Sequence, residues 1–455
     1  MDPAVLRAIS PLDGRYRKNL GKLESIFSEH ALMKYRTTVE IRWLQFLAEQ
    51  KVLPELQPFS QTANAFLNHL IENFDGESSI AIKKIEDTIN HDVKSIEYFL
   101  KEKIEKETGL AHAIEFIHFG CTSEDINNLA YALMLQCARK ECLLPDLNNL
   151  ISILKNFAHE HAEQPMLART HGQPATPTTV GKEIANVVSR LQRQMKQLNH
   201  AEILGKLNGA TGNYNALAVT YPKINWPTLS ENFLTSLGLT PNTYTTQIEP
   251  HDYIAELFAI LIRTNTILLD FNRDMWSYIS LEYFKLKTVD NEVGSSTMPH
   301  KVNPIDFENA EGNLGIANAL LDHLAQKLPV SRFQRDLSDS TVLRNMGVAI
   351  GHTLLAWQST VRGLGKITVN AATIRADLNH HWEILAEPIQ MIMRRLGMEK
   401  PYEQLKNFTR GQTMTRELIH QFIQSLVISD EVKNQLLELT PENYVGYAAE
   451  LAKNI

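Results

Sequence analysis

The sequence predicts an all-α fold, in which an elongated central bundle of long helices is flanked by two smaller helical domains. The 455 residues contain 21 Gly and 18 Pro. Together these are about 9% of the chain, below the ~12% that Gly and Pro make up in an average protein, so the chain makes few turns. Apolar residues recur at helical spacing over stretches of ~20 to 28 residues, which correspond to helices of ~30 to 42 Å. Strand signals are few, and residues 242–246 are a candidate for a short extended piece.

Changes in this pattern predict three domains. Their expected ranges are 1–111, 112–364 and 365–455. The first domain carries shorter helical patterns, at residues 32–47 and 80–100. The last domain is also helical but is interrupted by three prolines, which are Pro388, Pro401 and Pro441.

The central domain carries five long helical patterns. They cover residues 123–137, 177–198, 250–275, 314–324 and 342–361. Pro145 predicts a break or restart after the first of them. Thr176 and Pro177 supply an N-cap and a first-turn proline for the second. Several long helices in succession favour an elongated bundle.

Charge, cysteine content and hydropathy exclude several classes of protein. The net charge of −7 and the pI near 6.2 argue against a general nucleic-acid binder, which carries a basic excess. Three cysteines without a C-x-x-C pair are typical of a reducing compartment. The N-terminus has no secretory pattern, and the most apolar stretch, 254–271, is interrupted by charged residues. We therefore expect a cytoplasmic protein that binds neither nucleic acid nor membrane.

Sequence motifs for the common cofactors are missing. The sequence contains no G-x-x-x-x-G-K-[ST] loop, no G-x-G-x-x-G and no H-E-x-x-H. His159 and His161 are two residues apart on an expected helix, so their imidazoles diverge. We expect neither a metal ion nor an organic cofactor.

Three polar segments beside the long helices are candidates for a functional site. The segment 294–304, G-S-S-T-M-P-H-K-V-N-P, is a poor helix and is rich in hydroxyl, ammonium and amide donors. These donors suit a loop that closes over a carboxylate, although a flexible surface loop has the same composition. We expect residues 290–303 to be open without ligand and to close over substrate.

The other two polar segments are shorter. Segment 169–176 contains His171, a residue type that serves as general acid or base near neutral pH, with a structural histidine as the alternative. In segment 121–128, Thr122 and Asp125 form a T-x-x-D capping pattern. The same helix start can hold an anion, although capping alone is the simpler explanation.

The segment 294–304 resembles the G-S-S-x-M-P-x-K-x-N-P signature of the fumarase/aspartase superfamily and matches it at every fixed position. The other two polar segments fall where that superfamily has its remaining motifs. Within the superfamily, the chain is most similar to the adenylosuccinate lyase family. The similarity rests on residues 10–16, 88–93, 170–174, 331–336 and 340–344.

The resemblance implies a fumarase/aspartase-like, three-domain chain and a homotetramer in which three subunits build each active site. It implies a lyase that releases fumarate by cleaving a C–N bond. The substrates are adenylosuccinate, which gives AMP, and succinylaminoimidazole carboxamide ribonucleotide (SAICAR), which gives aminoimidazole carboxamide ribonucleotide (AICAR). Both reactions belong to purine nucleotide biosynthesis, on the routes to AMP and IMP. The alternatives are another lyase of the superfamily, such as argininosuccinate lyase or fumarase, and a non-catalytic helical scaffold.

By this resemblance, Ser295 is the general base and His171 is the general acid. The sequence does not decide between Ser295 and Ser296 as the base. A serine acts as a base only where its alkoxide is stabilised, and Lys301 is the cation available in the same segment. Lys301 and Asn303 would hold the carboxylate on which negative charge develops.

The resemblance also implies a set of substrate-binding residues. Those for the nucleotide and its phosphate are Arg15, Tyr16, Arg335, Ser340 and Arg344, since bidentate arginine contacts suit phosphate. Those for a succinyl carboxylate and another polar group are Thr122, Ser123 and Gln247. The remaining positions that match the family are Asn90, His91, Asp92, Ser296, Val302, Asn309, Thr341, Val342 and Leu343.

Two of these assignments have simpler alternatives. His91 would orient the phosphate or His171, but a histidine at this place can also be a structural residue at a helix start. If residues 332–335 are helical, Arg332 and Arg335 share a face and can pair with Asp336 or Asp339 instead.

Overall fold

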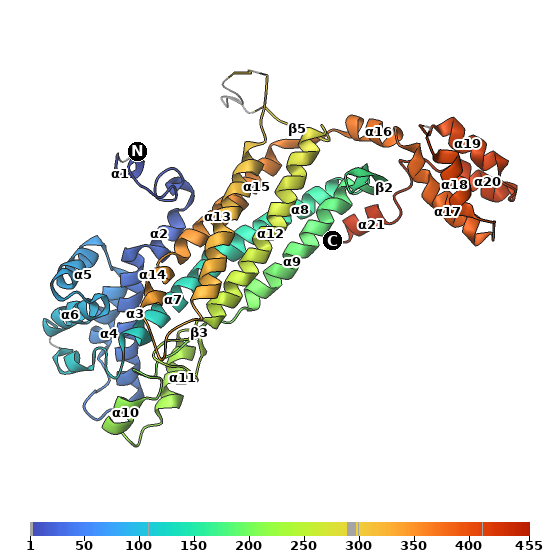
Figure 1. Cartoon of the computed structure of the whole chain (residues 1–455). Helices are drawn as coiled ribbons and strands as arrows, with labels where there is room; N and C mark the ends of the chain where they lie inside the picture. The colour runs from blue at the N-terminus through green and yellow to red at the C-terminus, as the bar shows by residue number, and fades with distance from the viewer. Residues whose placement is uncertain (1–2, 108, 289–296, 299, 412) are drawn as a thin grey trace. The chain divides into compact units, whose positions relative to one another are not determined.

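The computed structural model describes residues 3–107, 109–288, 297–298, 300–411 and 413–455 (Figure 1). Its α-helices are α1 (Pro3–Leu6), α2 (Gly21–Phe27), α3 (Glu29–Gln50), α4 (Gln61–Glu72), α5 (Gly76–Ile89), α6 (Asp92–Glu105), α7 (Ser123–Ala138), α8 (Leu144–Glu160), α9 (Val180–His200), α10 (Asn215–Thr220), α11 (Trp226–Ser236), α12 (Asp252–Ser280), α13 (Ile305–Lys327), α14 (Ser338–Leu343), α15 (Met346–Gly365), α16 (Ala371–Asn379), α17 (Ala386–Arg395), α18 (Pro401–Thr409), α19 (Arg416–Ser425), α20 (Asp430–Leu437) and α21 (Ala448–Lys453).

The remaining elements are short. The 3₁₀-helices are η1 (Arg17–Asn19), η2 (Ala111–Phe116) and η4 (Trp382–Leu385), and η3 (Arg139–Leu143) is a π-helical turn. The strands are β1 (Pro165–Thr170), β2 (Gln173–Thr179), β3 (Leu204–Gly205), β4 (Thr240–Pro241), β5 (Phe284–Leu286) and β6 (Ile367–Val369). These strands form two-stranded pairs, β1 with β2, β3 with β4 and β5 with β6. Over the described residues the chain is mainly helical, and the predicted all-α class is confirmed.

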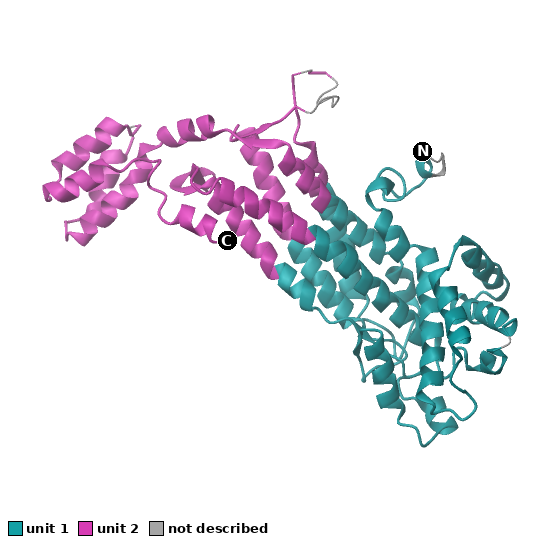
Figure 2. Cartoon of the chain, turned by 180° about the vertical axis from the view of Figure 1, so that it is seen from behind, with its two compact units in different colours: residues 1–146, 194–265, 312–356 teal, residues 147–193, 266–311, 357–455 magenta. Residues whose placement is uncertain are grey.

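Two compact units make up the chain (Figure 2). The first contains residues 1–146, 194–265 and 312–356, and the second contains residues 147–193, 266–311 and 357–455. Both are discontinuous in sequence because five helices, α8, α9, α12, α13 and α15, contribute residues to each unit. The expected domain boundaries near 111 and 364 stay a prediction.

In the first unit, the long helices are joined by polar side chains inside an apolar interface. Asn265 of α12 donates to the Thr353 hydroxyl of α15 over 3.1 Å, and His352 of α15 lies 2.8 Å from the side-chain carbonyl oxygen of Asn313 on α13. Leu261 of α12 is fully buried nearby in the same helix. A polar pair in such an interface must be satisfied, so it holds the helices in one register.

In the second unit, α8 and the start of α9 approach each other closely. A Cβ added at Gly181 would lie 2.3 Å from the carbonyl oxygen of Ala158 and 2.6 Å from the Cα of Ala162. Because both obstacles are backbone atoms, glycine is needed at this contact. Farther along α9, Arg190 forms an ion pair of 2.7 Å with Asp270 of α12.

Local signals decide several helix ends. The single pattern expected over residues 80–100 is two helices, α5 and α6, because Asn90 takes a left-handed φ of 53° and ends α5. The break expected at Pro145 is the π-helical turn η3, which joins α7 to α8. Pro401 opens α18 as its first residue rather than interrupting a helix.

Two expectations for the middle of the chain were wrong. The helix expected from Pro177 begins at Val180, because residues 173–179 form strand β2 instead of a helix start. This strand pairs antiparallel with β1, so most of the polar segment 169–176 belongs to a β-hairpin. The strand near the candidate extended piece at 242–246 is instead β4, which precedes it and pairs in parallel with β3.

The hairpin is packed on the C-terminal helices of the second unit. One buried cluster contains Leu378, Ile389, Leu405, Ile419 and Leu436, from α16, α17, α18, α19 and α20. Leu167 of β1 belongs to the same cluster. The hairpin therefore shares a core with these helices, which restrains its position.

Candidate active site

His171 lies at the tip of the β1–β2 hairpin. His171 and Gly172 stand between the paired residues Thr170 and Gln173, and both have positive φ, 55° and 74°. A two-residue hairpin turn with two left-handed positions matches the right-handed twist of its strands. His171 is exposed. A left-handed backbone costs a non-glycine residue ~1–2 kcal/mol, so the turn supplies no reason of its own for a histidine here.

The end of β1 next to the turn is fixed by a carboxylate from α16. Arg169 of β1 donates to Asp377 over 2.5 Å, and the Tyr283 hydroxyl donates to the same oxygen. Burial acts to raise the pKa of Asp377, but the bonds from Tyr283 and Arg169 outweigh it and hold the pKa below its usual value. Burial and the bond to Asp377 raise the pKa of Tyr283 to about 12. The hairpin is therefore anchored to α16 through Arg169, which lies two residues before His171.

In the first unit, the start of α7 presents two hydroxyls. Thr122 and Ser123 are half-buried there. The backbone N–H of Thr122 donates to the Asp125 carboxylate over 2.8 Å, which confirms the predicted capping pattern. Asp125 is itself fully buried and forms an ion pair of 3.0 Å with the buried Lys206. The capping box also uses the Thr122 oxygen as an acceptor, so the Thr122 and Ser123 hydroxyls meet an incoming anion as donors.

Arg335 is held beside this helix start. Its Nη2 lies 3.1 Å from Glu124 Oε2, and its Nη1 donates to Gln247 Oε1 over 3.1 Å. Burial raises the pKa of Glu124 although Arg335 opposes the shift. The structure thus brings together three predicted elements of the site, which are the α7 start, Gln247 and Arg335.

The pairing considered for Arg335 does not occur. Residues 331–337 are not helical, and Phe333 takes a left-handed φ of 51°. Arg332 pairs with Asp336 at 3.9 Å. Arg335 is mostly buried and pairs with Glu124 instead, whereas Arg332 is exposed.

The segment 90–92 is a helix boundary with a charged end. Asn90 ends α5, and His91 is the N-cap of α6, where its Nδ1 accepts the N–H of Lys94 over 3.1 Å. The structural role considered for His91 is therefore present, and it leaves Nε2 as the ring donor. Asp92 accepts from Arg36 over 2.7 Å and from Arg344 over 3.2 Å.

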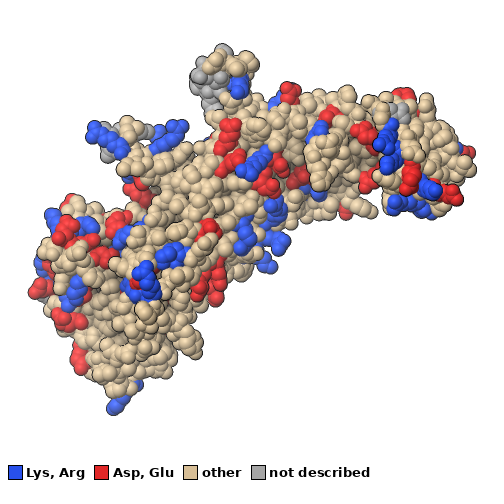
Figure 3. Space-filling view, viewed as in Figure 1, with Lys and Arg blue, Asp and Glu red and all other residues tan. Residues whose placement is uncertain are grey.

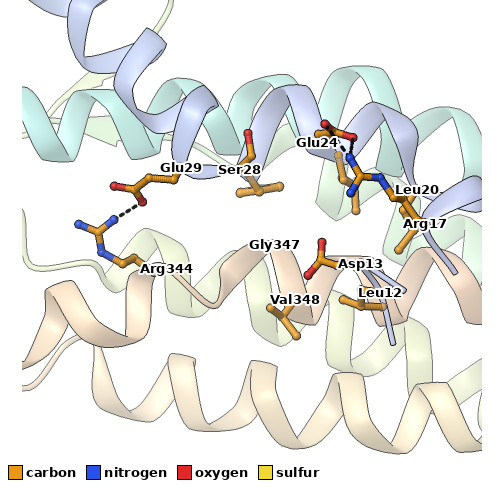
Figure 4. A pocket seen from close by; sticks show the side chains of 12 residues that line it. Leu12, Asp13, Arg17, Leu20, Glu24, Ser28, Glu29, Arg344, Gly347 and Val348 are labelled. Atoms are coloured by element: carbon orange, nitrogen blue, oxygen red, sulfur yellow. Dashed lines mark hydrogen bonds and ion pairs between the residues drawn. The ribbon is translucent and has the colours of Figure 1, made fainter. Parts of the chain in front are cut away.

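Arg344 lies at the wall of a pocket of about 450 Å³ (Figure 4). The pocket is lined by Leu12, Asp13, Arg17, Leu20, Leu23, Glu24, Phe27, Ser28, Glu29, Arg344, Gly347 and Val348. Figure 4 shows Arg344 paired with Glu29 at one end of the pocket and Arg17 paired with Glu24 at the other. A phosphate that binds Arg344 must therefore share or displace the Glu29 and Asp92 carboxylates.

The other predicted binding residues lie in several places. In the first unit Arg15 is exposed beside the ring of Tyr16, with its guanidinium carbon 5.9 Å from the ring centre. Ser340, Thr341, Val342 and Leu343 lie in α14, where Leu343 is buried.

The segment that carries the lyase signature is described in part. Lys301 and Val302 are exposed and Asn303 is half-buried. The backbone of residues 300–304 is not helical, and α13 follows at Ile305. Asn309 of α13 accepts from the Ser359 hydroxyl over 3.0 Å. The catalytic assignments for Ser295 and Ser296, and most of the expected closing segment 290–303, lie outside the described residues.

Several residues of this network were missed by sequence reasoning. Arg36 is 1% exposed and donates to Asn127 over 2.8 Å as well as to Asp92. Through Asn127 and Glu124 it links the Asp92–Arg344 pair to Arg335. One signal was available, because Arg36 lies four residues after Leu32 on the apolar face of its helix.

Metal binding finds little support in these groups. Of the described residues, Glu124, His251 and Asp339 form the one cluster of metal-ligand type, with their ligand atoms within 4.8 Å of one another. Arg335 already places a guanidinium 3.1 Å from Glu124. A guanidinium of the protein therefore already pairs with one of the three groups that a metal ion would need.

Replacing Asp92 by asparagine is expected to lower the free energy of unfolding by about 1.5–3 kcal/mol at pH 7, because the buried Arg36 loses a charged partner. Burial raises the pKa of Asp92, but Arg36 and Arg344 outweigh it and lower the pKa. The stabilisation is therefore present above the unfolded pKa of ~3.9 and is lost as the pH falls through the lower folded pKa.

Urea unfolding of wild type and Asp92→Asn at pH 7 and near pH 3 measures this difference. The difference in the free energy of unfolding between wild type and Asp92→Asn should be smaller at the acidic pH. Asp87→Asn, an exposed acid of α5, is the matched control and should change little. An equal gap at both pH values would contradict the assignment.

Matches to two family models place the chain among the lyases. The family described as "Lyase" matches residues 14–317, and that described as "Adenylosuccinate lyase C-terminal" matches residues 331–445. Among solved structures, a fumarate lyase from Mesorhizobium sp. BNC1 covers 95% of this chain and 97% of its own, with a TM-score of 0.77 and 17% identity. The 3-carboxy-cis,cis-muconate lactonizing enzyme from Pseudomonas putida covers 95% and 96%, with a TM-score of 0.74 and 22% identity. These two likenesses concern the fold.

Closer relatives decide the family. The adenylosuccinate lyase of Haemophilus influenzae is 57% identical over 455 residues, and that of Escherichia coli K12 is 55% identical, each with 100% of both chains covered. The chain belongs to the adenylosuccinate lyase family, and it is an enzyme of the lyase class.

The face in view carries charges of both signs. Figure 3 shows basic and acidic side chains interspersed over it. Among the helices that are described, none has the length and apolar character needed to cross a bilayer.

Proposed function

We propose that this enzyme eliminates fumarate from adenylosuccinate to give AMP and from SAICAR to give AICAR, two reactions of purine biosynthesis. The observation that carries the proposal is the convergence at α7, where the hydroxyl pair of Thr122 and Ser123 lies beside the Arg335–Gln247 pair. Hydroxyls at a helix start suit a carboxylate, and guanidinium groups suit carboxylate or phosphate. The substrates carry both kinds of anion.

The reaction needs a base, an acid and a place for negative charge. Ser295 removes the C–H proton next to a carboxylate, and the resulting carbanion spreads onto that carboxylate. Lys301 and Asn303 hold the carboxylate as its charge grows, where one preorganised donor is typically worth ~3–4 kcal/mol. His171 then protonates the leaving nitrogen, and the C–N bond breaks with release of fumarate.

Arginines of the first unit bind the nucleotide end of the substrate. Arg344 binds the phosphate, with Ser340 and Thr341 of α14 adding hydroxyl and backbone donors. Arg15 and Tyr16 cover the nucleotide from the N-terminal segment, and the exposed His91 Nε2 supplies a further donor. Asn90, Asp92, Val302, Asn309, Val342 and Leu343 complete the binding set.

The direct test mixes the purified enzyme with adenylosuccinate and follows the fall in absorbance as AMP forms. Chromatography should find fumarate and AMP in equal amounts. The same assay with SAICAR should yield AICAR and fumarate. Turnover of argininosuccinate or of malate, without turnover of adenylosuccinate, would favour another lyase of the superfamily, and the lack of any turnover would favour a scaffold.

The enzyme acts as a homotetramer in which several chains build each site. The exposed face of α13 supports this, since Gly312, Gly315, Ile316 and Ala319 lie there together. A Cβ at Gly312 or Gly315 would meet no other part of the described chain within 4 Å. Small residues that the chain does not itself require suit close approach by a second copy.

Light scattering is expected to give a native mass near that of four chains of 51.6 kDa. Ile316→Asp should lower the mass and the activity together, because it places a charge on the exposed α13 face. Met391→Asp changes an equally exposed apolar residue of α17 and should leave the mass unchanged. A fully active monomer would contradict the shared site. The cytoplasm remains the proposed location.

A further inference from the structure

A buried histidine lies behind the nucleotide-binding residues and has no part in the reaction proposed above. His251 is 2% exposed and directly precedes α12. Its Nδ1 is 3.7 Å from a Glu249 oxygen, and its Nε2 is 3.7 Å from Asp339 Oδ2. Both ring nitrogens and this Asp339 oxygen are buried and make no hydrogen bond to the described residues. A carboxylate oxygen therefore faces each ring nitrogen of His251 at 3.7 Å.

The surroundings of His251 are predominantly acidic. The charged and titratable groups around it are Glu249, Asp252 and Tyr253 of its own segment, Glu124 of α7, Arg335 and Asp339 around the start of α14, and Lys206 after β3. Arg335 is paired with Glu124, and Lys206 is paired with Asp125. His251 is therefore the group placed to compensate Glu249 and Asp339, and an unpaired buried carboxylate is costly.

The backbone of His251 is held in place as well. Its N–H donates to Glu249 Oε2 over 2.7 Å, and its φ of 67° is left-handed. Its carbonyl accepts from the N–H groups of Ile254 and Ala255 at the start of α12. Sparsely populated backbone conformations of this kind persist where the surroundings determine them.

Asp339 connects this cluster to the nucleotide-binding segment. Its Oδ1 accepts the N–H of Ser340 over 2.7 Å. Burial acts to raise the pKa of Asp339, but His251 and Arg335 outweigh it, so the pKa lies below its usual value. Ser340 opens the run 340–344 that ends in Arg344. The Asp339 carboxylate therefore contacts both His251 and the first residue of this run.

We infer that His251 is a positioning residue for nucleotide binding, whose imidazole bridges Glu249 and Asp339 and thereby holds Ser340 and the run to Arg344 in place. This inference rests on the proposed function, because it concerns the same nucleotide site. It assigns to His251 an effect on substrate affinity and none on the proton transfers.

A metal ion in this cluster is the competing explanation. Glu124, His251 and Asp339 are ligand types that zinc accepts. The guanidinium of Arg335 at 3.1 Å from Glu124 opposes a second cation there. Dialysis of the wild type against Zn²⁺ is therefore included in the test, and the inference expects no stoichiometric binding.

The test measures steady-state kinetics on adenylosuccinate and AMP affinity by calorimetry for wild type, His251→Gln, Asp339→Asn and the double variant. Each single variant is expected to raise KM and the AMP dissociation constant about tenfold while kcat stays within about threefold. The double variant should raise KM and the AMP dissociation constant no more than the single variant with the larger effect, because both substitutions remove the same His251–Asp339 contact. A merely structural role would lower the melting temperature without changing KM in the folded protein.

The controls keep the test decisive. His352→Gln changes another buried histidine, which lies 2.8 Å from Asn313, and it should leave KM unchanged. If His251→Gln does not fold, His251→Asn replaces it, because asparagine tolerates a left-handed backbone.

Three results would overturn the inference. If the folded variants keep KM within about twofold of wild type, the inference is wrong while the proposed function stands. The same holds if the wild type binds one Zn²⁺ per chain and His251→Gln does not. A wild type that does not turn over adenylosuccinate would overturn the proposed function and the inference with it.

Discussion

His171→Asn is expected to lower kcat on adenylosuccinate by ~10²–10⁴-fold, the usual contribution of a general acid. Asparagine suits the change because His171 and Gly172 form a turn with φ of 55° and 74°. Asn-Gly is the favoured pair for a turn with two left-handed positions. The variant removes the imidazole and keeps the hairpin, whereas alanine at this φ would add backbone strain.

Steady-state rates on both substrates, with circular dichroism as the check on folding, measure this effect. KM should change little, because the lost interaction is made chiefly in the transition state. His159→Asn, at an exposed histidine of α8, is the matched control and should retain wild-type kcat. A His171→Asn enzyme with kcat within threefold of wild type would remove His171 from the mechanism.

Ser295→Ala is the second large change, and a loss of kcat above ~10²-fold is expected, since it removes the hydroxyl proposed to take the C–H proton. The assignment rests on the G-S-S-x-M-P-x-K-x-N-P signature, which residues 294–304 match in full. Lys301 of that signature is exposed, so its ammonium is available to a substrate carboxylate and to a serine alkoxide.

Ser296→Ala is the matched control, because it removes the neighbouring hydroxyl of the same segment. It should reduce kcat far less than Ser295→Ala. The opposite order would transfer the role of base to Ser296, and equal small losses would exclude both residues. A fumarate-release assay with saturating adenylosuccinate separates these results from changes in affinity.

The long helices were predictable because their apolar residues keep one period over many turns. The patterns from 123, 250, 314 and 342 correspond to α7, α12, α13 and α15. The β1–β2 hairpin was not predictable in this way. Its second strand contains Pro174 and Pro177 and is polar, so it has no alternating apolar pattern. Its pairing is stabilised by the left-handed turn at His171 and by Leu167 in the C-terminal core.

The candidate site also contains one part that local sequence predicts and one part that it does not. Thr122 and Asp125 are three residues apart, so their capping interaction follows from local sequence and was predicted. Arg335 has two local acidic neighbours, Asp336 and Asp339, yet it pairs with Glu124 of α7. Local spacing could not select that partner, since the backbone around Arg335 is irregular and Glu124 lies far away in sequence.

The sequence by itself determined the helical class, the capped start of α7 and the family, because periodicity, caps and signature motifs are all encoded in residues that are close along the chain. Tertiary structure alone decided which charges are buried and with whom they pair. Arg36 with Asp92, Arg335 with Glu124, and His251 between Glu249 and Asp339 are the cases. The physical reason is that a buried charge must find its counter-charge in space, and folding brings that partner from a distant segment.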